Sequence, residues 1–282
     1  MSECTIARNP LRVALRYGML SVLAFVVVCP LAWLLMASLR PQAEIFQPVS
    51  DFGWHTLVPS SLTLDNYLAL LKGDFPLALR NSSVVALTTV VFGLLVNALA
   101  GFAFAAFDFR GKNLLFLLVI VSFMMPFEAI VMPLYVMINA FGWTNSYKAL
   151  IIPEVANGMI IFLFRQFFAS IPKDFYEAAR VDGASWLYIW AFIAMPLSWP
   201  TIATSSLMLF LAQWDSFFWP VVAASDPKYA VVQVAIARNI NFEQNDWGGL
   251  FASTSLAIVI GTIPFLLMQR FYVRSLISGG IK

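Results

Sequence analysis

The sequence predicts an all-α integral membrane protein with six transmembrane helices, formed by a single domain over residues 1–282. The 282 residues are 61% hydrophobic and only 11% charged, whereas a soluble domain averages roughly 25% charged. Six apolar runs reach the length of about 20 residues with which a helix crosses about 30 Å of hydrocarbon. The runs show no strand-like alternation, and helices satisfy every backbone polar group within one segment. A lipid bilayer is therefore the solvent that this composition fits.

The six predicted spans are separated by polar connections that are rich in turn residues. The first span, residues 17–39, exceeds the apolar core of about 7–15 residues that a signal peptide uses. No small-residue cleavage pattern follows it, so we expect it to be a retained transmembrane helix. The other spans are expected at residues 82–107, 114–138, 147–168, 199–222 and 251–272.

The distribution of Lys and Arg predicts the orientation of these spans. Cytoplasmic connections carry an excess of both residue types. If the N-terminus is cytoplasmic, 11 of the 17 Lys and Arg residues fall on the cytoplasmic side. The bias favours both termini inside, in the cytoplasm.

Composition and motifs exclude several classes of chemistry. The single histidine, His55, has no neighbouring Cys or His that could share a metal ion. Cys4 lies in the N-terminal tail and Cys29 in an apolar run, which does not indicate a disulfide framework. No catalytic cluster that would suit an intramembrane enzyme is recognisable. The chain also lacks a Walker A pattern, so any ATP hydrolysis would take place in a partner.

One polar segment, residues 172–196, interrupts the apolar pattern between the fourth and fifth spans. Pro172 is expected to end the preceding helix. Asp174 and Glu177 are spaced like a capping box at the start of a short helix. Gly183 fits the left-handed residue that stops such a helix. These signals predict a helical hairpin in which Ser185 caps the second helix and Pro196 ends it.

This hairpin admits two interpretations when only the spacing of its residues is considered. In the first, it is a surface structure in which Glu177 only caps a helix and Arg180 only reflects membrane topology. In the second, it is a docking helix on which Ala178 and Ala179 permit close approach of a partner, while the two charged side chains offer ion pairs. The spacing alone does not decide between them.

The wider pattern of this region resembles the EAA signature of binding-protein-dependent ABC importer permeases. That signature is carried here by Glu177-Ala178-Ala179, Gly183, Ile193 and Met195-Pro196, although the family commonly has Leu at the position of Met195. The resemblance extends to the carbohydrate branch, specifically the smaller six-span permease of maltose-importer type. It rests there on Phe164-Arg165-Gln166-Phe167-Phe168, Ile171-Pro172, Asp182-Gly183-Ala184-Ser185 and Trp214-Asp215-Ser216-Phe217-Phe218-Trp219-Pro220.

The resemblance implies a complete transport machine around this chain, in the cytoplasmic (inner) membrane of a bacterium. A second, homologous permease would complete the pathway, two cytoplasmic ATPases would hold the ATP and Mg, and an extracytoplasmic sugar-binding protein would deliver the cargo. This chain would bind no cofactor and no nucleic acid. The hairpin residues implied to contact an ATPase are Glu177, Ala178, Ala179, Arg180, Asp182 and Gly183. The C-terminal tail, with Gly279, Gly280 and Lys282, is implied to reach the ATPase pair as well.

Polar side chains inside the predicted spans are the candidates for a substrate pathway. Ionisable groups there are costly and usually face a cavity or a partner. Pro126 and Pro133 flank Glu128 and could open the third helix. Hydrogen bonding between helices is the alternative role for the same polar groups, and Asn97, with Gly93 and Gly101, is expected to serve close helix packing. The candidate pathway residues are Glu128, Asn157, Gln213 and Asp215, although the family more often carries Asn at position 215.

A coupled importer permease therefore explains the spans, the hairpin and the missing nucleotide motif together. A stand-alone secondary transporter usually has more spans and broken inverted repeats, and it has no need of a docking hairpin. The expected cargo is a sugar or sugar derivative. Glycerol phosphate or another anionic sugar derivative, carried by the same machinery, is the alternative.

Overall fold

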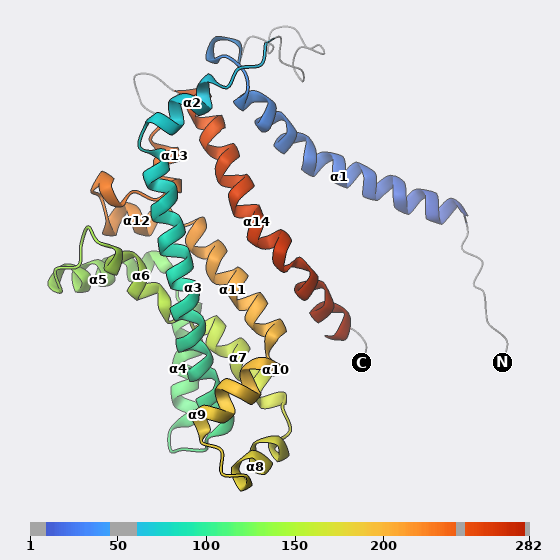
Figure 1. Cartoon of the computed structure of the whole chain (residues 1–282), viewed down its shortest axis with the longest axis vertical. Coiled ribbons are helices and arrows are strands. Elements are labelled where there is room, and N and C mark those ends of the chain that lie inside the picture. Colours follow the sequence, from blue (N-terminus) through green and yellow to red (C-terminus); the bar gives the residue numbers. More distant parts are fainter. Residues whose placement is uncertain (1–9, 46–60, 241–245, 280–282) are drawn as a thin grey trace. The chain divides into compact units, whose positions relative to one another are not determined.

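The computed structural model describes residues 10–45, 61–240 and 246–279, and every regular element within these ranges is helical (Figure 1). The chain forms two compact units. One consists of Met1–Gly73 with Asn239–Leu256, and the other of Asp74–Arg238 with Ala257–Lys282. Helix α14 (Trp247–Gly279) contributes its first turns to the first unit and the remainder to the second.

The first unit contains α1 (Pro10–Ser38), the short 3-10 turn η1 (Gln42–Glu44) and α2 (Asp65–Lys72). The side-chain amide of Asn66 joins α2 to the end of α1, because it donates to the carbonyl oxygens of Ser38 and Arg40 at 2.9 and 2.8 Å. Trp33 of α1 meets Phe251 of α14 edge to face, with ring centroids 5.3 Å apart. Polar anchoring at one end and aromatic contact along the helix hold this unit together.

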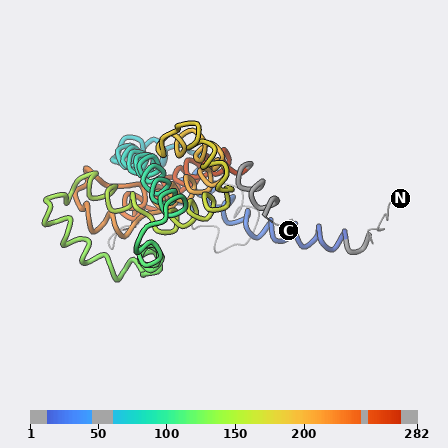
Figure 2. The backbone as a smooth tube through the Cα atoms, turned by 90° about the horizontal axis from the view of Figure 1, so that it is seen from below, coloured from blue at the N-terminus to red at the C-terminus, as the bar shows by residue number. Residues whose placement is uncertain are grey.

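Helix α3 (Phe75–Ala106) is the central element of the second unit. It packs against α6 (Tyr147–Val155), α7 (Gly158–Ser170) and α11 (Trp199–Trp214). Figures 1 and 2 show α7 and α11 running alongside it. Small residues permit this close approach: a Cβ added to Gly101 would lie 2.6 Å from the Cβ of Phe164. The sequence-based expectation of close packing at the small residues of this helix is confirmed.

The remaining elements of the second unit are short. They comprise α4 (Lys112–Met124), α5 (Phe127–Ala140), α8 (Lys173–Val181), α9 (Trp186–Ile189), the π-helical turn η4 (Trp190–Ala194), α10 (Met195–Leu197), α12 (Phe218–Ala223), the 3-10 turn η5 (Pro227–Tyr229) and α13 (Val232–Ala237).

Four helical segments of the described chain are long and apolar enough to cross a membrane, and the number rises to six if two bent pairs each count as one span. The predicted third span is one of these pairs: α4 and α5 meet at 103°, because Pro126, the N-cap residue of α5, has extended backbone and cannot continue α4. The predicted fifth span is shorter than expected. Its helix α11 ends at Trp214, and α12 begins separately at Phe218.

Candidate functional site

The hairpin between the fourth and fifth spans consists of α8, the turn after it, and the continuous run α9–η4–α10. Helix α8 buries Tyr176 and leaves Glu177, Ala178 and Arg180 exposed. The Tyr176 hydroxyl donates to the carbonyl oxygen of Phe168 at 3.2 Å, and its ring contacts Phe102 edge to face. Burial raises the pKa of Tyr176 to about 12. One side of α8 is therefore anchored to α3 and α7, while the opposite side faces outward.

The predicted capping box at the start of this helix is wrong. Helix α8 begins at Lys173, directly after Pro172, and has no side-chain cap. Proline disfavours helical conformation in the residue before it but suits a helix start. Asp174 consequently falls inside the first turn, where a carboxylate complements the helix dipole. Glu177 is exposed and makes no hydrogen bond within the described part of the chain, so it is not a helix cap.

The end of α8 is fixed by its backbone, as the sequence predicted. Gly183 has φ +84°, in the left-handed region. The N–H of Gly183 donates to the carbonyl of Arg180, and the N–H of Ala184 donates to that of Ala179, both at 3.0 Å. These two bonds form a Schellman motif, which satisfies the last carbonyl groups of a helix. Ser185 then caps α9 as predicted, because its hydroxyl accepts from the N–H of Tyr188 at 3.2 Å.

Arg180 braces this turn from the outside. Its guanidinium donates to the carbonyl oxygen of Ala184 at 2.7 Å and lies 5.4 Å from the centre of the Trp186 ring. The side chain nevertheless remains exposed. Arg180 therefore has a structural role in the turn, in addition to the topological or docking role that the sequence suggested. Its exposed guanidinium still offers hydrogen-bond donors to a partner.

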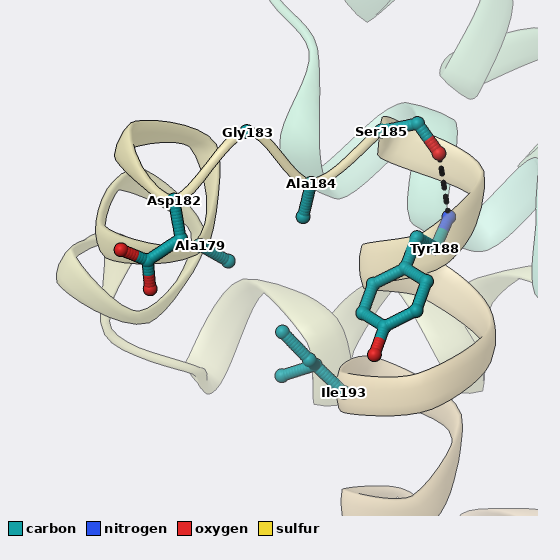
Figure 3. A pocket seen from close by; sticks show the side chains of 7 residues that line it. All are labelled: Ala179, Asp182, Gly183, Ala184, Ser185, Tyr188 and Ile193. Carbon is teal, nitrogen blue, oxygen red and sulfur yellow. Dashed lines mark hydrogen bonds between the residues drawn. The ribbon is translucent and has the colours of Figure 1, made fainter.

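A hollow of ≈ 600 Å³ lies between the end of α8 and the run that follows the turn (Figure 3). Its floor is built from small or apolar side chains, and the Tyr188 ring borders it on the side of α9. The hollow is lined by Ala179, Asp182, Gly183, Ala184, Ser185, Tyr188 and Ile193. Three of the six predicted coupling residues (Ala179, Asp182 and Gly183) therefore line it, and the other three stand on the adjacent helix α8.

The second arm of the hairpin, α9–η4–α10, packs into the core of the second unit. Ile189, Trp190 and Ala194 are buried in one apolar cluster with Phe164 of α7 and Leu209 of α11. This arm ends at Leu197, one residue after the Pro196 at which the sequence predicted its end, and the chain then bends by 84° at Ser198. This arm of the hairpin therefore packs directly against α3, α7 and α11.

The candidate pathway residue Asn157 lies at a break in the fourth span, where α6 ends and α7 begins. Its side-chain oxygen accepts from the N–H groups of Met159 and Ile160 at 3.1 and 3.2 Å, which caps α7. Asn97 of α3, fully buried, accepts from the Asn157 N–H at 2.8 Å. These contacts give Asn157 a structural role that its position in the sequence did not reveal.

Gln213 and Glu154 form a polar contact between the fourth and fifth spans. The buried Gln213 amide donates to a carboxylate oxygen of Glu154 at 3.3 Å. Asp215, two residues beyond Gln213, is exposed at the C-terminal cap of α11. Glu128 is exposed in the first turn of α5, and no hydrogen bond within the described residues links it to the other three candidates. The structure therefore brings Gln213 to Glu154 rather than to Glu128 or Asn157.

The predicted C-terminal contact lies mostly beyond the structural description. Gly279 is the last residue of α14, whereas Gly280 and Lys282 fall outside the described residues. Within the described residues no group of three or more His, Cys, Asp or Glu side chains could hold a metal ion.

Within the described residues, apolar helical segments long enough to cross a membrane, two of them bent pairs of helices, and a hairpin exposed on one side are typical of a membrane transport component. Residues 93–278 match the family described as binding-protein-dependent transport system inner membrane component, and the chain belongs to this family. It is therefore a multi-pass inner-membrane protein that works with an ATPase and a binding protein and has no catalytic activity of its own. Members of the family typically bind no cofactor.

Named relatives cover nearly the whole chain. It is 33% identical to the AraQ permease protein of the arabinooligosaccharide transport system of Halalkalibacterium halodurans, over 92% of this chain and 93% of that one. It is 26% identical to the lactose transport system permease protein LacG of Rhizobium radiobacter, over 99% of both chains. It is 28% identical to the sn-glycerol-3-phosphate transport system permease protein UgpE of Rhizobium meliloti, over 97% and 99%.

A solved structure shares the fold. The chain superposes with a TM-score of 0.83 on a bacterial ABC transporter involved in the import of the acidic polysaccharide alginate, over 96% of this chain and all of that one. The two sequences are 21% identical, so this likeness supports the fold alone.

Proposed function

We propose that this chain is a permease subunit that imports a sugar or oligosaccharide, and that α8 with its adjoining hollow is where a cytoplasmic ATPase docks. The observation that carries the docking site is the division of α8 into an anchored side at Tyr176 and an unengaged side at Glu177 and Ala178. The hairpin is a poor candidate for an independent surface loop, because its second arm is buried among three spans. Relatives named for arabinooligosaccharides and lactose support the cargo class.

The proposal also includes the other subunits of the transporter and the orientation of this chain in the membrane. A second, homologous permease completes the pathway, two ATPases supply ATP hydrolysis, and both termini lie in the cytoplasm. The excess of Lys and Arg on the hairpin side supports this orientation. Closure of the ATPases would move the hairpin, and the buried Ile189 and Trp190 would pass that movement to α3, α7 and α11. The C-terminal tail is proposed to add a second ATPase contact.

Gln213 and Asp215 are proposed to line the route of the cargo through this subunit. Ionisable and amide groups at membrane depth usually face a cavity or a partner. Glu128 and Asn157 remain candidates for the same route, although Asn157 is already engaged in capping α7. An anionic cargo is the second candidate, because one relative is named for sn-glycerol 3-phosphate.

The docking site is tested with the complete transporter in lipid, assembled with its ATPases, second permease and binding protein. The charge reversal Glu177→Lys should abolish the rise in ATP hydrolysis that cargo-loaded binding protein produces, while the complex stays assembled. Asp65→Lys, on the exposed first turn of α2, is the matched control and should leave stimulation intact. Unchanged stimulation in the Glu177 variant would remove Glu177 from the ATPase contact.

A further inference from the structure

Two of the three carboxylates in the predicted spans lie where the helix dipole is unfavourable to them. Glu154 lies in the last turn of α6, and Asp215 is the C-terminal cap of α11. The C-terminal end of a helix carries partial negative charge, so a carboxylate there is repelled. Glu128, by contrast, lies in the first turn of α5, where the dipole favours it. Glu154 and Asp215 therefore occupy places that oppose local stability.

Within the described residues, no ion pair joins Glu154 or Asp215 to a cation. No Lys, Arg or His occurs in the sequence between residues 149 and 164 or between residues 181 and 227. The same absence holds between residues 81 and 109 and between residues 113 and 147. The membrane-depth charge contributed by these spans is consequently entirely negative.

The hydrogen-bonding capacity of Glu154 is also mostly unused. A carboxylate offers about four acceptor positions, and within the described part of the chain Glu154 receives one bond, from Gln213. The buried Gln213 side chain orients the carboxylate, and Glu154 keeps part of its surface exposed beside the break at Ala156. A ligand that supplied several hydroxyl donors and no negative charge would match this acceptor.

We infer that Glu154, oriented by Gln213, is a specificity-determining residue that favours neutral, polyhydroxylated cargo and repels anionic cargo. This inference rests on the proposed function, because it presumes that the chain lines a cargo route. Violations of local stability rules are expected at functional sites, and here the violation comes with an oriented acceptor. Glycerol phosphate and acidic sugars are disfavoured by the same negative charge.

The charge of the site can be measured without knowing the cargo. Cys4 and Cys29, the two native cysteines, are replaced by serine, and Ala156→Cys places a reporter thiol at the exposed break next to Glu154. The complete transporter in lipid is then treated with thiol reagents of matched size that carry a positive or a negative charge, with and without nucleotide. The cationic reagent should react several-fold faster, and Glu154→Gln should abolish that preference. Asp65→Asn should leave it unchanged.

Three results would overturn the inference. If the reporter thiol reacted in neither nucleotide state, the Glu154–Gln213 pair would be a dry contact between helices. If both reagents reacted equally in the presence of Glu154, the partner permease would be supplying a compensating cation. If the preference for the cationic reagent survived Glu154→Gln, another group would be the source of the negative charge. Failure of the proposed function is distinguishable, since it appears as unaltered ATPase stimulation in Glu177→Lys, whatever the thiol chemistry shows.

Discussion

The side-chain amide of Asn97 donates a 2.8 Å hydrogen bond to the carbonyl oxygen of Val155, a residue 58 positions further along the chain. The Asn97 oxygen accepts from the N–H of Asn157 at 2.8 Å. One buried side chain of α3 thus satisfies backbone groups on both sides of the break between α6 and α7. Broken helices are tolerated at membrane depth only where the freed backbone groups find such partners.

Asn97→Ala should destabilise the transporter, because it leaves the Val155 carbonyl and the Asn157 N–H without their partner. Each buried polar group left unsatisfied costs about 1–3 kcal/mol. The midpoint of thermal unfolding of the assembled complex in lipid measures the effect. Ser83→Ala is the control, because within the described residues the Ser83 hydroxyl bonds only to the carbonyl of Leu79 in its own helix. Equal stability of the two variants would contradict the role assigned to Asn97.

Local signals explain which of these features could be predicted from sequence. Hydrophobic length located the spans, and the glycine pattern located the hairpin turn at Gly183, because each depends on neighbouring residues alone. The role of Asn97 depends on a partner far away in the chain, so the sequence indicated only close packing. Likewise Gln213 was predicted to be a pathway residue from its place in a span, but its pairing with Glu154 depends on the arrangement of two spans.

Three expectations rested on proline, and one of them failed. Pro126 was expected to open the third helix, and it does, by a bend of 103° that divides the predicted span. Pro196 was expected to end the second arm of the hairpin, and the run α9–η4–α10 ends one residue later, at Leu197. The expectation of a cap at Asp174 was wrong, because Pro172 itself is the N-cap residue and α8 begins two residues earlier than a cap at Asp174 would place it.

Gly101→Ala should also destabilise the protein, through overpacking between α3 and α7. An added Cβ would lie 2.6 Å from the Cβ of Phe164 and 2.9 Å from the backbone nitrogen of Arg165. Overpacking of this kind costs about 1–3 kcal/mol. Gly18→Ala in α1 is the control, since nothing lies within 4 Å of its added Cβ. Thermal unfolding of the complex compares the two variants, and a neutral Gly101→Ala would show that the helices can separate freely.

Tyr176 should ionise late. Because burial raises its pKa to about 12, the folded state favours the neutral phenol. The stabilisation is fully present below the ordinary tyrosine pKa of about 10 and is lost as pH rises from there through the folded-state value. Absorbance titration of the complex should show one late phenol that is missing in Tyr176→Phe. Titration of Tyr176 together with exposed tyrosines would contradict its anchoring contact with Phe168.

Gly183→Ala should weaken the coupling of ATP hydrolysis to transport. Gly183 ends α8 at φ +84° and has open space around its missing Cβ, so the cost of the substitution is conformational, about 1–2 kcal/mol for a left-handed residue. A backbone that relaxes away from this conformation moves the Schellman turn and the walls of the hollow.

Gly142→Ala is the matched variant for this experiment. Gly142 also has a left-handed φ, +64°, with nothing within 4 Å of an added Cβ, but it lies in the connection between α5 and α6. Both variants should lose similar stability, because both carry the same backbone strain. Only Gly183→Ala should lower the amount of cargo imported per ATP hydrolysed by the reconstituted transporter. An equal loss of coupling in the two variants would trace the effect to general instability rather than to the geometry of the hairpin.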